Sequence, residues 1–175
     1  TTERGAQLKT ESLNWSRNDD LVTTQDKVVI TDQGLNATGQ GAQAQPKLNK
    51  AQMNKDVTVN MIPDVKDPNS KNVTITCDGP MEIDQLKNQA VFNENVVAVQ
   101  EGRILKADKV EIYFDQEKYP GFFAWIIPTS TDVAKVGVAG KGINAAVALE
   151  NFLTQKGKHS IVRKVFAPIW IKGPI

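Results

Sequence analysis

The stretch Asn49-Lys-Ala-Gln-Met-Asn-Lys-Asp-Val-Thr-Val59 recurs 39 residues later as Asn88-Gln-Ala-Val-Phe-Asn-Glu-Asn-Val-Val-Ala98. Asn, Ala, Asn and Val are identical at four aligned positions, and Met53 aligns with Phe92, another large apolar residue. Each copy is a polar turn followed by an alternating, β-branched run, which is typical of one short antiparallel unit used twice. Because such a unit cannot bury its apolar face alone, the repeat predicts a stacked β architecture. Chance similarity between two polar hairpins is the alternative.

Composition excludes several classes of function. The chain has 175 residues, of which 40% are hydrophobic, so it can form a real core. Its 21 basic and 20 acidic side chains give a net charge of +1, with no basic stripe for nucleic acid. No run of apolar residues is long enough for a membrane-spanning helix. The single Cys77 has no partner for a disulfide within the chain.

The period-two pattern extends on both sides of the repeat, from about Leu8 to Phe114. Turn residues separate the alternating runs roughly every ten residues, without a convincing helix, which favours a sandwich, a jelly roll or an open barrel. Gly34, Gly39 and Gly41 lie in a small-residue stretch that fits either a close approach of two backbones or a loop. The expected strands are Val28–Thr31, Asp56–Ile62, Asn72–Cys77, Pro80–Asp84, Asn95–Val99 and Lys109–Phe114.

The pattern changes after Gln116. An aromatic run at 119–128 and the segment 132–139 predict a hairpin. A helix is then expected over 145–156, with Asn144 as its N-cap and Gly157 as its stop. A last strand is expected over 160–166. These features divide the chain into a β jelly-roll module at 8–115 and an α+β fragment at 116–175, built from a hairpin, a helix and a strand.

The first module resembles a known family. The runs Leu8–Trp15, Val29–Gly34 and Thr38–Gly41 resemble the LptC class of periplasmic lipopolysaccharide-transport proteins. The runs Ile75–Ile83, Ala90–Val96 and Gly102–Val110 resemble the OstA or LptA repeat. The resemblance implies a twisted, open, antiparallel β jelly roll (OstA-like) whose apolar interior carries acyl chains and whose edge strands pair with the next protein.

The last sixty residues resemble the geranylgeranyl reductase family of FAD-dependent proteins. The run Pro120-Gly-Phe-Phe-Ala-Trp-Ile-Ile-Pro128 is similar to that family's motif beside the flavin and isoprenoid pocket, with Ile127 in place of an aromatic residue. In that reading Phe123, Trp125 and Pro128 contact the cofactor. No G-x-G-x-x-G follows a strand, so the dinucleotide-binding turn is missing and we expect no bound cofactor.

Catalytic and metal sites are not predicted. His159 lacks a nucleophile or a second histidine and is expected in a surface loop, and Cys77 fits a small buried residue. The candidate site is instead a set of apolar residues for lipid binding, which would equally form a dry core, because alternation alone does not separate a core from a lipid slot. The set is Val57, Val59, Met61, Val73, Ile75, Met81, Ile83, Phe92, Val97, Val99, Ile104, Val110, Ile112 and Phe114.

Together these observations predict a non-enzymatic, mainly β protein with one C-terminal helix. It would bind lipopolysaccharide or a similar glycolipid and pair through edge strands with other Lpt-type jelly rolls. Nucleic acid is not an expected partner. A periplasmic location is expected, either free or tethered to the inner membrane by a removed N-terminal segment. The substrate-pocket part of a flavin-dependent reductase and a β-rich interaction domain without ligand are the alternatives.

Overall fold

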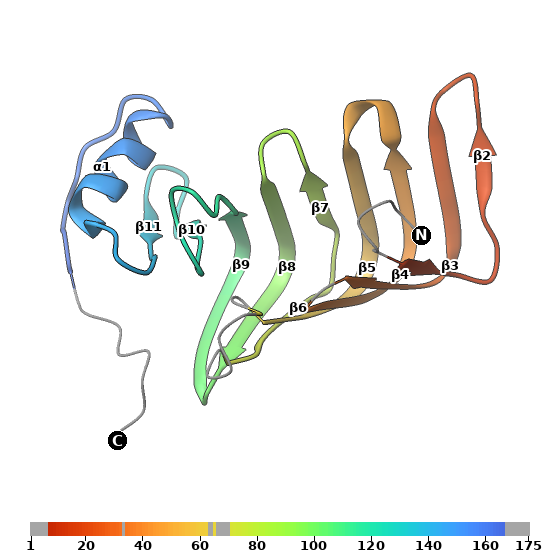
Figure 1. Cartoon of the computed structure of the whole chain (residues 1–175), viewed down its shortest axis with the longest axis horizontal. Helices are drawn as coiled ribbons and strands as arrows, with labels where there is room; N and C mark the ends of the chain where they lie inside the picture. Colours follow the sequence, from red (N-terminus) through yellow and green to blue (C-terminus); the bar gives the residue numbers. More distant parts are fainter. Residues whose placement is uncertain (1–6, 33, 63–64, 66–70, 167–175) are drawn as a thin grey trace.

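A computed structural model describes residues 7–166 except 33, 63–64 and 66–70. Strands dominate the described chain, with one α-helix near its end (Figure 1). The elements are β1 (Gln7–Lys9), β2 (Asn14–Ser16), β3 (Leu21–Asp32), β4 (Leu35–Gln45), the 3-10 turn η1 (Pro46–Leu48), β5 (Lys50–Met61), β6 (Val73–Cys77), β7 (Met81–Asp84), β8 (Gln89–Gln100), β9 (Arg103–Tyr113), β10 (Ala124–Pro128), β11 (Ala134–Val138) and α1 (Ala145–Thr154).

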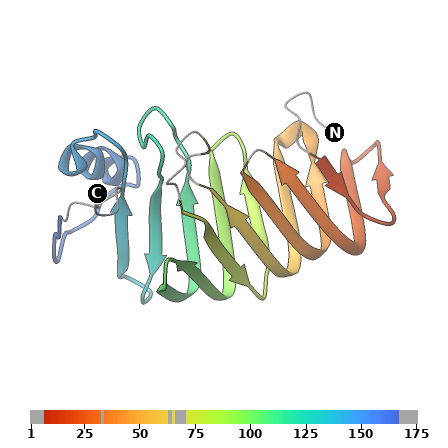
Figure 2. The same cartoon turned by 60° about the horizontal axis from the view of Figure 1, so that its bottom comes forward.

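The strands form one antiparallel sheet that bends into two halves. Its order is β1-β3-β4-β5-β6-β8-β9-β10-β11, with β2 paired to β3 and β7 paired to both β5 and β8. Because β6 pairs with the second part of β5 and β7 with its first part, β6 and β7 lie one after the other between β5 and β8. We call the part that contains β1 and β6 the lower half and the part that contains β2, β7, β10 and β11 the upper half. The long strands pass through both, so the sheet folds over on itself as a twisted, open jelly roll (Figures 1 and 2).

Irregular residues line up where the long strands bend. Register shifts fall between Thr24 and Lys27 of β3, between Lys55 and Thr58 of β5, and between Asn93 and Val96 of β8. Extra residues of this kind bend a strand and increase its twist. The turn between β6 and β7 crosses the same line, where the backbone oxygen of Asp78 accepts from the Asp56 amide at 2.9 Å and the Asp78 amide donates to the Glu94 oxygen at 2.9 Å. The bend is therefore one continuous fold line.

Two glycines allow the backbones to approach at this line. Gly79 has φ +118°, and a Cβ there would lie 2.3 Å from the Asn54 carbonyl oxygen. Gly41 has φ +71°, and its Cβ would lie 2.7 Å from Asn54 Nδ2. The small-residue stretch around Gly41 is therefore a strand, β4, whose glycines allow close contact with β5, and not a loop.

The internal repeat corresponds to two equivalent strands, β5 and β8. Asn49 and Asn88 precede them in the left-handed conformation, with φ of 53° and 49°. Each strand has 12 residues. The aligned pair Met53 and Phe92 is buried in the same core. The sequence duplication thus builds the same bent strand twice.

The C-terminal segment continues the sheet across the predicted boundary between residues 115 and 116. In β10, Ala124 to Ile126 pair with Tyr113 to Glu111 of β9, and β10 forms the expected hairpin with β11. Asn144 caps α1 as expected, because its Oδ1 accepts from the amides of Ala146 and Val147 at 3.1 and 3.2 Å. The helix ends at Thr154, before Lys156.

The strand expected over residues 160–166 is a wrong prediction. These residues are all exposed, and they pair with none of the described strands. Their alternation of apolar and polar residues fits a strand, but a strand forms only where a sheet edge or another strand offers backbone partners. Figure 1 shows this part of the chain beside α1, on the side away from the sheet. The residues after 166 lie outside the described part of the chain.

The apolar interior of the jelly roll

Most of the predicted lipid-binding residues come together between the two halves. Nine belong to one buried cluster, and Ile83 and Phe114 pack partly buried against it. The cluster also contains Val28, Met53 and Val96. It occupies the inner face of the bent sheet, so the interior is apolar along its length. The nine buried members are Val57, Val59, Met61, Val73, Ile75, Met81, Phe92, Val110 and Ile112.

Three predicted residues do not face the interior. Val99 and Ile104 are 37% and 64% exposed, and Val97 is only half-buried. Val96, fully buried, takes the interior position in β8, with Ala98 packed against the cluster. Alternation does not continue simply through the fold line, where Glu94 and Asn95 both have positive φ. The repeat would have predicted the correct inward residues of β8, because Val96 and Ala98 align with the interior residues Val57 and Val59.

A small apolar pocket opens in the interior near the N-terminal end of the sheet. Its volume is about 60 Å³. Two of its residues, Leu8 and Leu13, belong to the segment 7–16, which crosses from the lower half to the upper half along the edge of β3. The other lining residues come mainly from β3, β4, β5 and β7: Val22, Thr23, Thr24, Ile30, Ala42, Gln43, Ala44, Ala51, Gln52, Met53, Met81 and Ile83.

Few contacts hold the crossing segment. β1 and β2 each pair with β3 over three residues. Between them, the Thr10 and Thr24 hydroxyls are 3.1 Å apart, and Ser12 Oγ donates to the Asp26 carboxylate. Leu8, Leu13 and Trp15 remain about half-exposed. We call residues 7–16 the N-terminal strap.

Aromatic side chains fill the opposite end of the interior. The ring centroids of Phe114 and Phe123 are 6.1 Å apart, and those of Phe123 and Trp125 are 6.0 Å apart. Trp125 lies directly over Gly137 of β11, where a Cβ would be only 2.1 Å from the indole ring. Pro128 is exposed on the opposite face of β10 from Trp125 and Ile127. The structure therefore brings Phe123 and Trp125 together and leaves Pro128 apart.

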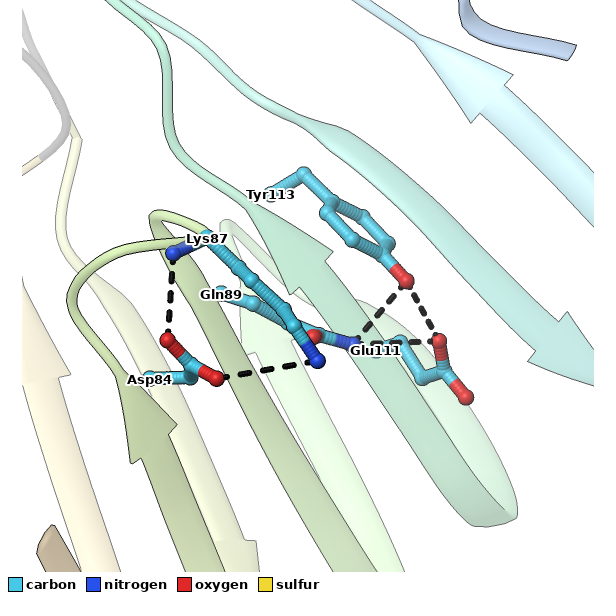
Figure 3. A network of polar contacts seen from close by, with 5 residues as sticks. All are labelled: Asp84, Lys87, Gln89, Glu111 and Tyr113. Atoms are coloured by element: carbon cyan, nitrogen blue, oxygen red, sulfur yellow. Dashed lines mark hydrogen bonds and ion pairs between the residues drawn. The ribbon is translucent and has the colours of Figure 1, made fainter. Parts of the chain in front are cut away.

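The outer face of the upper half is polar by contrast. Gln89 Nε2 donates to the Tyr113 hydroxyl at 2.9 Å and to Glu111 Oε2 at 3.3 Å, and the Tyr113 hydroxyl donates to Glu111 at 2.6 Å (Figure 3). Lys109 Nζ lies 2.9 Å from Glu111. Burial alone would raise the pKa of Glu111, but the bonds from Tyr113 and Lys109 outweigh it and hold that pKa below its ordinary value. Burial and the neighbouring Glu111 raise the pKa of Tyr113.

A shallow hollow of about 420 Å³ adjoins this network. Polar side chains dominate its lining, among them Gln43, Gln52, Glu82 and Asp84. Gln43 Nε2 donates to Gln52 Oε1 at 3.1 Å, and Lys87 Nζ lies 3.7 Å from Asp84. The same strands therefore present an apolar inner face and a polar outer face.

The helix α1 covers the outer face at the β9–β11 end. Phe152 is 3% exposed and packs edge-on against Tyr113, with ring centroids 5.1 Å apart, and against Tyr119 at 6.3 Å. Lys156 Nζ lies 3.6 Å from the centroid of the Tyr113 ring. These contacts fix α1 on the sheet without entering the apolar interior.

The reactive side chains stand apart from one another. His159 is exposed, as expected, and its Nδ1 lies 2.9 Å from the Gly157 carbonyl oxygen. Cys77 is 4% exposed in the core, and burial raises the pKa of its thiol, which makes it unreactive. Within the described residues, no group of three or more histidine, cysteine or acidic side chains could hold a metal ion. In the same part of the chain, no helix has the length and apolarity that a membrane span requires.

Comparison with solved structures supports the fold. The chain is similar to LptH from Pseudomonas aeruginosa, described as the LptA homologous periplasmic component of the lipopolysaccharide transport device. The TM-score is 0.55 at 14% sequence identity, covering 81% of this chain and 89% of that chain. A search of curated proteins found no match.

A family model adds evidence from the sequence. Residues 74–159 match the model described as "LptA/(LptD N-terminal domain) LPS transport protein". The matched range begins in β6 and ends after α1, so it includes β10, β11 and the helix together with the second copy of the repeat. Nothing in the comparisons bears on the reductase resemblance. The chain therefore has the LptA-type β jelly-roll fold, and its residues 74–159 match the family of LptA and LptD N-terminal lipopolysaccharide-transport domains.

Proposed function

We propose that this protein carries lipopolysaccharide or a similar glycolipid and holds the acyl chains between the two halves of its jelly roll. The observation that carries the proposal is the continuous apolar cluster on the inner face, in a chain whose residues 74–159 match a lipopolysaccharide-transport family. Within the described residues, the outer face carries no apolar cluster as large as the one between the two halves. A role as a carrier requires no chemical step, and we propose no enzymatic activity.

The energetics favour acyl chains as the bound group. Burial of one CH₂ group contributes about 0.8 kcal/mol, so even part of one chain contributes useful affinity. The pocket of about 60 Å³ is much smaller than the roughly 300–1,000 Å³ of ordinary small-ligand sites. An acyl chain therefore enters only if the strap or the two halves move apart. The small side chains of Ala42, Ala44 and Ala51 beside the pocket favour entry at this end.

We further propose that partner jelly rolls pair with the free edges of the sheet. At one end, the short β1 and β2 are the only described strands on the edge of β3 that faces away from β4. At the other, β10 pairs with β9 only at Glu111–Tyr113, so no described strand covers the rest of that edge of β9. Exposed backbone groups on such edges accept a further strand. We place this assembly in the periplasm, because the similar LptH is described as a periplasmic component.

Site-specific photo-crosslinking tests the lipid proposal. A crosslinking amino acid at Phe92 or Ile75, both on the inner face, should capture lipopolysaccharide, because these side chains lie in the apolar cluster. The matched control is Glu82, which is exposed on the opposite face of β7 from Met81. Equal capture at all three positions would contradict binding between the halves.

Crosslinking also tests the edge proposal. Ile104 lies on the free edge of β9 and is 64% exposed, whereas Leu86 is 75% exposed in the turn between β7 and β8. A crosslinker at Ile104 should yield a product with a second jelly roll, and one at Leu86 should not. Products of the same size and yield at both positions would indicate random collision instead of strand addition.

A further inference from the structure

We propose that residues 157–166 dock this protein on the surface of a bilayer that contains anionic phospholipid. The segment follows α1 and reads Gly-Lys-His-Ser-Ile-Val-Arg-Lys-Val-Phe. It lies on the outer side of α1, away from the apolar interior (Figure 1). The proposal therefore does not depend on the carriage of lipid between the two halves.

Large apolar side chains in this segment are left in water. Val162 is 91% exposed, Val165 is 68% exposed and Phe166 is 52% exposed. Ile161 is 42% exposed. With it, four exposed apolar residues lie within the six positions 161–166. Scattered single exposures are ordinary on protein surfaces, whereas a contiguous group indicates a binding surface.

Positive charge accompanies these apolar residues. Lys158, Arg163 and Lys164 lie in the segment, and no aspartate or glutamate occurs from residue 151 to the end of the sequence. The chain as a whole is nearly neutral, at +1, so its charge is unevenly distributed. Lys164 of the segment forms an ion pair with Glu150 of α1 at 3.2 Å, and both side chains are exposed, so water screens it.

A bilayer with anionic headgroups satisfies both features at once. Basic side chains near such a surface are attracted by its negative potential, while neighbouring apolar side chains enter the boundary between headgroups and acyl chains. A second protein with an apolar groove would bury the valine side chains, but an apolar groove would not attract the positive charges of the segment. The segment extends from the helical end of the molecule, opposite the strap, so docking there leaves the pocket end free.

Co-sedimentation of the full chain with lipid vesicles tests this proposal. Binding is expected to vesicles of phosphatidylcholine mixed with phosphatidylglycerol, to be much weaker on pure phosphatidylcholine, and to fall as salt screens the charges. The double variant K158Q/R163Q should bind roughly 30-fold more weakly, since each basic residue contributes about a fivefold change. The double variant V162S/V165S should bind roughly tenfold more weakly through lost apolar contact.

Matched variants on the jelly roll provide the controls. R103Q/K106Q removes one arginine and one lysine that are exposed on β9, and L48S/L86S removes two apolar residues that are exposed in η1 and in the β7–β8 turn. Neither control should change vesicle binding by more than roughly twofold, because β9, η1 and the β7–β8 turn lie outside the segment. Equal losses in controls and test variants would overturn the proposal, as would equal binding to both kinds of vesicle. A change in oligomeric state of V162S/V165S without a change in vesicle binding would assign the segment to a second copy of the chain instead.

Discussion

Gly79 lies where β6 passes into β7, and the backbone of β5 leaves no room there for a side chain. Its φ is +118°, and a Cβ would lie 2.3 Å from the Asn54 oxygen and 2.6 Å from the Lys55 Cα. The variant G79A should therefore lower the free energy of unfolding by about 3 kcal/mol, from backbone strain and from displacement of β5. Gly102 provides the control, because its φ is +77° but nothing lies within 4 Å of its Cβ position. In urea denaturation, G102A should cost only about 1 kcal/mol; equal losses would show that crowding at the fold line is unimportant.

Glu111 predicts a pH dependence of stability. Its pKa in the folded chain is below the ordinary value of 4.5, so folding favours the charged form. That contribution is fully present above pH 4.5 and is lost as the pH falls through the folded pKa. The variant E111Q should therefore be about 1 to 2 kcal/mol less stable than the parent at pH 7, and the difference should shrink in acid.

Thermal denaturation of both proteins from pH 7 to pH 3 measures this difference. Glu117, which is exposed in the loop after β9, provides a control substitution. E117Q should change the stability at pH 7 by less than about 0.5 kcal/mol. A loss in E111Q that stays constant down to pH 3 would exclude the charge of Glu111 as its cause.

At the scale of the strand, β5 and β8 place their apolar residues on the inner face by the same pattern. Val96 is fully buried, whereas Val97 is half-buried and faces Lys106 of β9 across the sheet. The variant V96D should cost about 4 kcal/mol or prevent folding, because it buries an unpaired carboxylate. V97D should cost less than about 1 kcal/mol, since its carboxylate reaches solvent and Lys106. Circular dichroism and urea denaturation distinguish the two, and a larger loss in V97D would contradict the alignment of the two repeat copies.

The strands also show what sequence can and cannot predict here. The repeat predicts the stacked β architecture, and the capped helix is predicted within two residues, because turn residues and caps act locally. The side of β8 that faces inward beyond Asn93 was predicted wrongly, because two left-handed residues at the fold line interrupt simple alternation. The strand expected at 160–166 was wrong for a different reason, since a strand depends on a partner that local sequence does not specify. Alternation alone predicts an apolar face. Whether that face leaves room for lipid or is packed as a core depends on how closely the two halves approach each other.

At the scale of the whole molecule, the closed interior and the proposed cargo differ in size. The pocket of about 60 Å³ is bounded at its edge by the strap, while Phe123 and Trp125 occupy the far end. Among the described residues, the strap is joined to β3 by short strand pairings and two side-chain hydrogen bonds, whereas the central strands pair over long registers. Local opening takes place most readily where few buried contacts must break. The strap is therefore the part of the jelly roll that we expect to move when lipid enters.

A disulfide across the strap tests this movement. The Thr10 and Thr24 hydroxyls are 3.1 Å apart, so cysteines at these positions bring two thiols together in place of the two hydroxyls. In a C77V background, which removes the buried free thiol, the oxidised T10C/T24C protein should load at least about tenfold less lipopolysaccharide than its reduced form, because the strap cannot leave β3. Reduction should restore loading, and the single variant T10C should load normally in either state. Equal loading of the oxidised and reduced forms would show that acyl chains enter elsewhere, by separation of the two halves along the free edge of β9.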